Sequence, residues 1–204
     1  MRPPLPRLHA ITDERTARRA DLDEVARELA AGGGPDLAFH ARGRALTGLE
    51  HYELANRLAV YPPTRLFVND RLDVALALNA AGVQLGHGSL PPSAARHLDA
   101  RWWIGRSVHD LAEAEAARAE GADYLVVGPV FATATHPDRP ALGVGPLREI
   151  ARLGLPVIAI GGVTPAGTRE VKAAGAYGVA AIRALWDAAE PGAVAGRMLE
   201  ELQR

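Results

Sequence analysis

The stretch Val157-Ile-Ala-Ile-Gly-Gly-Val-Thr-Pro165 decides the fold, because an apolar run ends on two glycines and passes straight into a helical pattern. A second apolar run, Val179-Ala-Ala-Ile-Arg183, follows after one helix and ends at a matching place. Adjacent strand ends that expose backbone N–H groups at helix starts attract anions, since unsatisfied donors and the helix dipole both favour a phosphate. We therefore predict a phosphate site formed by the backbone of Gly161, Gly162, Ile182 and Arg183.

The same alternation of short apolar runs and amphipathic helical runs recurs along the whole chain, at the length of a βα unit. Several apolar runs are continuous in Val, Ile and Leu, which is typical of a parallel sheet buried on both faces. The predicted strands are residues 7–12, 36–42, 64–69, 82–86, 102–108, 124–130, 156–161 and 178–183. Predicted helices include residues 21–31, 71–80, 110–120, 147–153 and 165–174. The pattern predicts an α/β fold, a single (β/α)8 TIM barrel over residues 1–204, with a doubly wound open sheet as the alternative.

Composition narrows the class of function. The 204 residues carry a formal net charge of -1 with interspersed charges, which predicts a small-molecule partner and argues against nucleic acid or a membrane surface. No apolar run reaches membrane-spanning length, so we expect a soluble cytoplasmic protein. The sequence has no cysteine, which excludes disulfides and thiolate chemistry. Lys172 is the only lysine and falls in a helical run, so a Schiff-base lysine at the barrel centre is excluded as well.

Basic side chains follow the second predicted strand. His40, Arg42 and Arg44 occupy every second position, and this period of two sends them to the same side. Two arginines beside a histidine would suit a carboxylate or phosphate of a substrate. In the alternative interpretation only His40 faces the barrel, and both arginines are solvated loop residues. His9 on the first strand is interpreted as a core histidine.

The next two strand ends bear on metal binding. Asn69 and Asp70 close the third strand, where Asn69 could contact a substrate and Asp70 could hold Mg²⁺, move a proton or simply cap the following helix. The fourth strand end, Gly86-His-Gly-Ser-Leu90, has no carboxylate. A single carboxylate is a poor Mg²⁺ site, so no resident metal is predicted.

Later segments add hydroxyl and imidazole groups. Ser107 and His109 lie where the fifth strand meets a helix; His109 could transfer a proton near neutral pH or only cap or pack at the helix start. Thr133, Thr135 and His136 lie in a Gly/Pro-rich segment after the sixth strand, where barrels carry functional loops. We predict that this segment contacts substrate, with an ordinary surface connection as the alternative.

Together these segments resemble the thiamine-phosphate synthase/TenI superfamily over essentially the whole chain. The resemblance rests on Leu8-His-Ala-Ile-Thr-Asp13, His40-Ala-Arg-Gly-Arg44, Val68-Asn-Asp-Arg-Leu-Asp73, Gly82-Val-Gln-Leu-Gly86, Gly105-Arg-Ser-Val-His109, Gly121-Ala-Asp-Tyr124, Gly128-Pro-Val-Phe131, Thr133-Ala-Thr135, Ile158-Ala-Ile-Gly-Gly-Val163 and Gly178-Val-Ala180. Each motif is weak alone, but their order and spacing are specific. It implies a phosphate-binding barrel that either couples a pyrimidine pyrophosphate to a thiazole phosphate with Mg²⁺, or isomerises a thiazole phosphate to its aromatic tautomer.

Departures from the synthase pattern favour the TenI branch. The synthase typically has Gln-x-Arg-x-Lys where this chain has His40, Arg42 and Arg44, and a second metal aspartate where it has Ser89. One departure points the other way, since Pro129 stands where some TenI proteins have a catalytic histidine. The loop at Thr133 also resembles that of the synthase.

The resemblance therefore predicts a thiazole tautomerase that needs no metal, with His40 or His109 as the acid/base and Arg42 on the substrate carboxylate. Its predicted partner is a small phosphorylated thiazole, and the resemblance also implies a homodimer. Two alternatives stay open: a thiamine-phosphate synthase in which Asp70 holds Mg²⁺, and a barrel that binds a thiazole or thiamine phosphate without catalysis.

Overall fold

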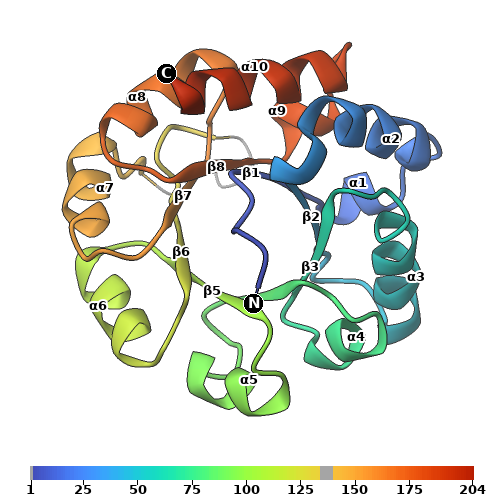
Figure 1. The fold of residues 1–204 in the computed structure, drawn as a ribbon, viewed down its shortest axis with the longest axis horizontal. Helices are drawn as coiled ribbons and strands as arrows, with labels where there is room; N and C mark the ends of the chain where they lie inside the picture. Colours follow the sequence, from blue (N-terminus) through green and yellow to red (C-terminus); the bar gives the residue numbers. More distant parts are fainter. Residues whose placement is uncertain (1, 134–139) are drawn as a thin grey trace.

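The computed structural model describes residues 2–133 and 140–204, and within them eight parallel strands close into one barrel in chain order (Figure 1). Closure is made by β1 and β8, where Leu8 pairs with Val179. The strands are β1 Leu8–Ile11, β2 Leu37–Ala41, β3 Arg65–Asn69, β4 Gly82–Leu85, β5 Trp103–Val108, β6 Tyr124–Val127, β7 Val157–Ile160 and β8 Gly178–Ala181. The predicted (β/α)8 barrel is confirmed, and each strand lies inside its predicted range.

Helices form a ring outside the barrel (Figure 1). Their bounds are α1 Glu14–Ala17, α2 Leu22–Gly33, α3 Gly48–Leu58, α4 Leu72–Ala77, α5 Pro92–Leu98, α6 Leu111–Ala119, α7 Val144–Ala151, α8 Pro165–Ala173, α9 Arg183–Trp186 and α10 Pro191–Gln203, with a 3-10 turn at Gly34–Asp36. The five predicted helices are present. The largest difference is α7, which starts three residues before its predicted range and ends two residues early. Helix α4 ends three residues early, close to Asn79, which adopts a left-handed backbone with φ of 48°.

Two apolar clusters account for the core. One lies between the strands and the helices and includes Trp102, Trp186 and Leu37. The other fills the barrel interior and includes Leu5, Phe67 and Tyr124. Inside the described ranges, no helix is long and apolar enough to cross a membrane.

The N-terminal segment, residues 2–6, closes the bottom of the barrel, the end opposite the carboxyl termini of the strands (Figure 1). Leu5 is 3% exposed and belongs to the interior cluster. Side chains of the barrel contact four consecutive carbonyls of the segment: Trp103 donates to Pro3 (3.1 Å), Arg65 to Pro4, Tyr177 to Leu5 (2.6 Å) and His9 to Pro6 (2.9 Å). The segment is therefore fixed to several strands at once.

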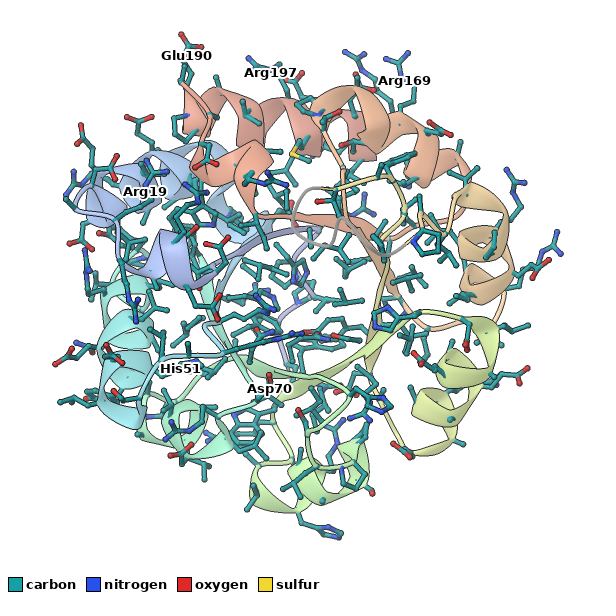
Figure 2. The ribbon with its side chains drawn as sticks, turned by 180° about the vertical axis from the view of Figure 1, so that it is seen from behind. Arg19, His51, Asp70, Arg169, Glu190 and Arg197 are labelled. Carbon is teal, nitrogen blue, oxygen red and sulfur yellow. The ribbon has the colours of Figure 1, made fainter. Side chains whose placement is uncertain are left out.

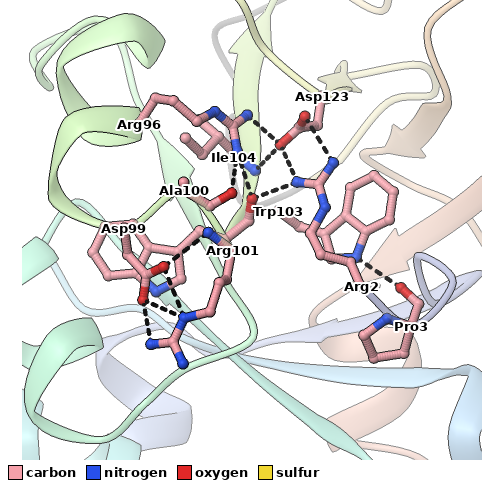
Figure 3. A network of polar contacts seen from close by, with 10 residues as sticks. Arg2, Pro3, Arg96, Asp99, Ala100, Arg101, Trp103, Ile104 and Asp123 are labelled. Carbon is pink, nitrogen blue, oxygen red and sulfur yellow. Dashed lines mark hydrogen bonds and ion pairs between the residues drawn. The ribbon is translucent and has the colours of Figure 1, made fainter.

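An ion network fastens the start of this segment (Figure 3). The Asp123 carboxylate lies 2.8 Å from Arg2 and 2.6 Å from Arg96, and it also accepts the Ile104 amide. The Arg2 guanidinium stacks 4.0 Å from the ring centre of Trp103. Burial alone would raise the pKa of Asp123, but hydrogen bonds from Arg2 and Arg96 lower it overall.

Candidate functional site

A cavity of about 630 Å³ opens at the carboxyl ends of the strands, where barrels of this kind carry their active sites. Seen from that side, Asp70 lies inside the ring of helices, whereas Arg169 and Arg197 lie on the outer surface (Figure 2). The predicted site residues that border the cavity are Arg42, Arg44, Asn69, Asp70, Ser107, His109, Thr133, Gly161, Gly162, Ile182 and Arg183. The barrel therefore brings residues of six strand ends to one cavity.

One end of the cavity, the glycine end, consists of Gly161, Gly162 and Ile182. Gly161 and Gly162 have φ of 93° and 66°, which disfavour any residue with a side chain. A Cβ on Gly162 would lie 2.5 Å from the Ala132 carbonyl oxygen, and one on Gly161 would lie 2.5 Å from the Pro129 Cα. Both glycines are therefore required by backbone conformation and by close packing.

Amide groups are the polar feature of the glycine end. The N–H groups of Gly161, Gly162 and Ile182 donate to no backbone carbonyl of the described residues. Helix α8 starts nearby, and its N-cap Thr164 accepts from the Gly167 amide. Unpaired amides beside a helix start suit an anion. The predicted phosphate residues, Arg183 included, thus border one cavity, although their role as phosphate ligands stays a prediction.

The other end, the arginine–aspartate end, consists of Arg42, Asn69 and Asp70 from the ends of β2 and β3. Arg42 is half-buried, and its guanidinium forms no hydrogen bond or ion pair within the described ranges. Burial and the charge of Arg44 lower the pKa of Arg42. Arg44 also borders the cavity but is exposed. Both arginines therefore border the cavity from the loop after β2, and the exposure of Arg44 agrees with its interpretation as a solvated loop residue.

His40 lies beneath the cavity and does not border it. Its side chain is fully buried, with Nε2 2.7 Å from His9 Nδ1 and Nδ1 3.2 Å from Asn69 Oδ1. Burial and the neighbouring His9 hold its pKa well below the usual range. A ligand in the cavity would not touch this imidazole, so the structure does not support the acid/base role predicted for it. The period of two gives the side on which His40 lies but not its depth.

Asp70 faces the cavity and does not cap a helix. Helix α4 has Arg71 at its N-cap, with no side-chain capping bond. Oδ1 of Asp70 accepts from the Gly86 amide at 2.8 Å and from the Ser89 hydroxyl. Its Oδ2 accepts no hydrogen bond from any residue that the structure describes, so this oxygen could bind a cation.

This arrangement fits Mg²⁺ only with substrate present. In the described part of the chain, no group of three or more His, Asp or Glu side chains could hold a metal by itself. Magnesium sites often combine one or two carboxylates with water and substrate phosphates. Asp70, with Ser89 beside it, is therefore a partial ligand set that phosphate oxygens could complete.

Gln84 is a site residue that the sequence analysis missed. Its Nε2 donates to Ser107 Oγ at 2.9 Å, which leaves the Ser107 hydroxyl hydrogen to point elsewhere. Its buried Oε1 has no partner. A Cβ on Gly105 would lie 2.2 Å from both Gln84 Oε1 and Tyr124 Cζ, so this glycine makes the room they occupy. The available signal was one amide at the centre of the apolar run of residues 82–86.

His109 and the segment after β6 complete the wall. His109 Nδ1 lies 2.5 Å from the Gly128 carbonyl and donates to it, while Asp110, not His109, caps α6. Thr133 borders the cavity. The predicted substrate residues Thr135 and His136 lie outside the described residues, so their predicted roles stay predictions.

A closed barrel with a polar cavity at the carboxyl ends of its strands defines the class as a TIM-barrel protein with an enzyme-like site. The chain belongs to the family described as thiamine monophosphate synthase, whose sequence profile matches residues 8–185. It is 43% identical over 184 residues to the thiamine-phosphate synthase of Methanospirillum hungatei, covering 87% of this chain and 88% of that protein. The thiamine-phosphate synthase of Chloroflexus aurantiacus is 39% identical over 203 residues, covering 96% and 92% of the two chains. The solved thiamine phosphate pyrophosphorylase from Pyrococcus furiosus superposes with a TM-score of 0.81 at 33% identity, covering 97% and 95%.

These relatives overturn one prediction. The superfamily assignment is confirmed, but the TenI branch and its tautomerase activity are wrong, because the similar curated proteins carry the synthase name. The error came from weighing His40 and Ser89 by residue type alone. In the structure His40 lies below the ligand space, and Ser89 hydrogen-bonds to the carboxylate that remains. The comparisons indicate an enzyme.

Proposed function

We propose that the protein is a thiamine-phosphate synthase, which couples hydroxymethylpyrimidine pyrophosphate to a thiazole phosphate. A bond forms between the thiazole ring nitrogen and the methylene carbon of the pyrimidine. The bond from that carbon to the pyrophosphate oxygen breaks, and its electron pair leaves with pyrophosphate. The observation that carries the proposal is the 39–43% identity to proteins of this name over most of the chain.

The contrast between the two cavity ends supports two separate anion sites. The thiazole phosphate is assigned to the glycine end, where unpaired amides at positive-φ glycines can surround a phosphate. Pyrophosphate is assigned to the arginine–aspartate end, where Arg42 supplies a fixed charge. The reacting carbon and nitrogen then meet between them, above Asn69 and Ser107. Holding both reactants in one cavity removes much of the entropic barrier to a reaction between two molecules.

The departing pyrophosphate gains negative charge, which the site must stabilise. Asp70, together with Ser89, is proposed to hold Mg²⁺, which when bound supplies positive charge for the leaving oxygens. Arg42 is proposed to contact the same group from β2, and the Ser107 hydroxyl to orient the pyrimidine. Thr133 is proposed to contact substrate on the opposite wall of the cavity.

Direct synthesis tests the proposal. The purified protein is incubated with both phosphates and Mg²⁺, and thiamine phosphate and inorganic pyrophosphate are quantified together. We expect equal amounts of the two products, and neither product when one substrate is omitted or the metal is chelated. Calorimetry on the same sample measures binding of each substrate. Binding of either phosphate without any thiamine phosphate would replace the proposal with a non-catalytic binding protein.

A further inference from the structure

A continuous hydrogen-bond chain runs from the bottom of the barrel to the floor of the cavity. It begins at the Pro6 carbonyl, 2.9 Å from His9 Nε2, and continues from His9 Nδ1 to His40 Nε2 at 2.7 Å. It ends where His40 Nδ1 lies 3.2 Å from Asn69 Oδ1. Within the described residues each ring nitrogen hydrogen-bonds only to its neighbour in this chain, so the chain links the N-terminal segment to a residue that borders the cavity.

The direction of this chain follows from its first acceptor. A carbonyl oxygen can only accept, so His9 Nε2 carries a hydrogen. If His9 is neutral, its Nδ1 can only accept, and His40 Nε2 must donate. If His40 is neutral as well, its Nδ1 must accept in turn, and its one hydrogen-bond partner among the described residues is the side-chain amide of Asn69.

The surroundings favour both neutral forms. His9 and His40 are fully buried, and their rings pack against Phe67 and Tyr124 with centroid distances of 5.0 to 5.9 Å. No carboxylate of the described residues hydrogen-bonds either ring. Burial lowers the pKa of His9 to about 4, despite its bond to Pro6. A doubly protonated imidazole is therefore disfavoured at either position near neutral pH.

A neutral chain has a consequence for Asn69. The structure places Asn69 Oδ1 toward His40 Nδ1, which in a neutral chain would set two acceptors against each other. A neutral chain therefore requires the opposite amide orientation, with the NH2 facing His40 Nδ1 and the carbonyl oxygen turned the other way. Oxygen and nitrogen of an amide are assigned from such networks and not from their positions alone. Asn69 is 7% exposed and borders the cavity, and its side chain makes no other hydrogen bond within the described ranges.

We propose that His9 is a positioning residue, which fixes the tautomer of His40 and thereby turns the carbonyl oxygen of Asn69 toward the cavity. The site then offers an acceptor at this point and selects a ligand N–H or O–H group there. On the proposed synthase function, on which this step rests, the donor belongs to the pyrimidine substrate. Beside it, Ser107 has its hydroxyl hydrogen available, so the floor presents one acceptor and one donor.

Imidazole ¹⁵N NMR on the substrate-free protein tests the direction without any assay of activity. We expect both His9 and His40 as the Nε2–H tautomer at pH 7. Two other histidines calibrate the spectrum: His51 donates from Nε2 to Ala41, whereas His109 donates from Nδ1 to Gly128. His40 found as the Nδ1–H tautomer, or as a cation, overturns the proposal whether or not the protein makes thiamine phosphate.

Two substitutions at His9 test the consequence. His9→Phe removes the acceptor but suits an aromatic environment, so His40 should change to the Nδ1–H tautomer and Asn69 should turn its NH2 outward. The KM for the pyrimidine pyrophosphate should then rise about tenfold, as expected for a lost hydrogen bond and an opposed donor, with the KM for thiazole phosphate unchanged. If turnover is absent, calorimetric binding of the pyrimidine compound serves instead.

His9→Asn is the matched variant, because its Oδ1 can replace Nδ1 as the acceptor. It should keep the wild-type tautomer of His40 and most of the wild-type KM. Equal KM changes in the two variants, or equal changes for both substrates, contradict a positioning role. Should His9→Phe fail to fold, the tautomers of the wild type and of His9→Asn still decide the question.

Discussion

The glycine end and the arginine–aspartate end of the cavity are built in different ways. At the glycine end the backbone of β7 and β8 forms the surface, and the requirement is for residues without side chains. At the arginine–aspartate end side chains from the ends of β2 and β3 form the surface, and hydrogen bonds to neighbours hold Asn69 and Asp70. The first kind of site tolerates no change at two positions, whereas the second can be rebuilt with different residues. Substitutions should therefore affect the two ends differently.

The largest effect is expected from Asp70→Asn. Among the described residues Asp70 is the one carboxylate that borders the cavity, and its loss should lower turnover about 10³-fold, since a bound metal contributes several kcal/mol and each 1.36 kcal/mol is tenfold in rate. The KM for thiazole phosphate should not change, because that substrate is assigned to the glycine end.

Steady-state kinetics with each substrate varied in turn measures this separation. Asp73→Asn is the control, since Asp73 pairs with Arg71 on the exposed start of α4. Similar losses of turnover in Asp70→Asn and Asp73→Asn would mean that turnover depends on the net charge of the protein and not on a carboxylate at position 70.

Gly162→Ala should produce the next largest effect, at the opposite end. With φ of 66° and a Cβ 2.5 Å from the Ala132 oxygen, alanine forces the backbone to move. A displacement of about 1 Å in a positioning group can reduce turnover about 10²-fold. The loss of activity should concern the use of thiazole phosphate. The dependence of the rate on Mg²⁺ concentration should stay as in the wild type.

Gly145→Ala is the matched control, because a Cβ there meets no atom of the described residues within 4 Å. It should leave both KM values unchanged. If Gly162→Ala alters the response to Mg²⁺ instead, the two ends are not independent.

Ser89→Asp should give a smaller change, in the favourable direction. Ser89 already hydrogen-bonds to Asp70, so a carboxylate there places a second charged oxygen beside the first. Ligand charge tunes the affinity of such sites, and we expect the Mg²⁺ concentration for half-maximal rate to fall about tenfold.

Calorimetric titration of Mg²⁺ into protein with pyrophosphate provides a reading that does not depend on turnover. Ser89→Asn, similar in size but uncharged, should show no gain. Weaker Mg²⁺ binding by Ser89→Asp would show that repulsion between the carboxylates dominates, and that the serine is needed at this end.

The two ends also differ in how far the sequence predicts them. Paired glycines between an apolar run and a helical run indicate a backbone site directly, because few other roles need two adjacent glycines there. The period of two likewise put Arg42 on the cavity side, where it lies. It could not give the depth of His40, which depends on where β2 sits along the barrel axis relative to β1 and β3.

The alignment of neighbouring strands, which the sequence does not give, also explains why the tautomerase prediction was wrong. Ser89 in place of a carboxylate indicates a lost metal ligand when only residue types are compared. The hydrogen bond between Ser89 and Asp70 is a property of the fold, because β3 and β4 must be aligned before the two residues meet. Strand positions, in contrast, follow from local apolar runs, and for that reason all eight were predicted with only their ends too long.

The smallest effect should come from Arg2→Ala, at the bottom of the barrel, and it tests whether the substrate-specific losses above are local. Arg2 binds Asp123 and stacks on Trp103 (Figure 3), and none of these three residues borders the cavity. Loss of these partly exposed contacts should cost about 1 kcal/mol and lower Tm by about 2–4 °C, with both KM values unchanged.

The pKa of Asp123 is lowered in the folded protein, so this stabilisation is present above the ordinary carboxyl value of 3.8 and is lost as pH falls through the folded pKa. The Tm difference between wild type and variant should therefore be constant near neutral pH and shrink below about pH 4. A rise in only one KM would show that the bottom of the barrel communicates with one end of the cavity, and the Asp70 and Gly162 results would then need a global explanation.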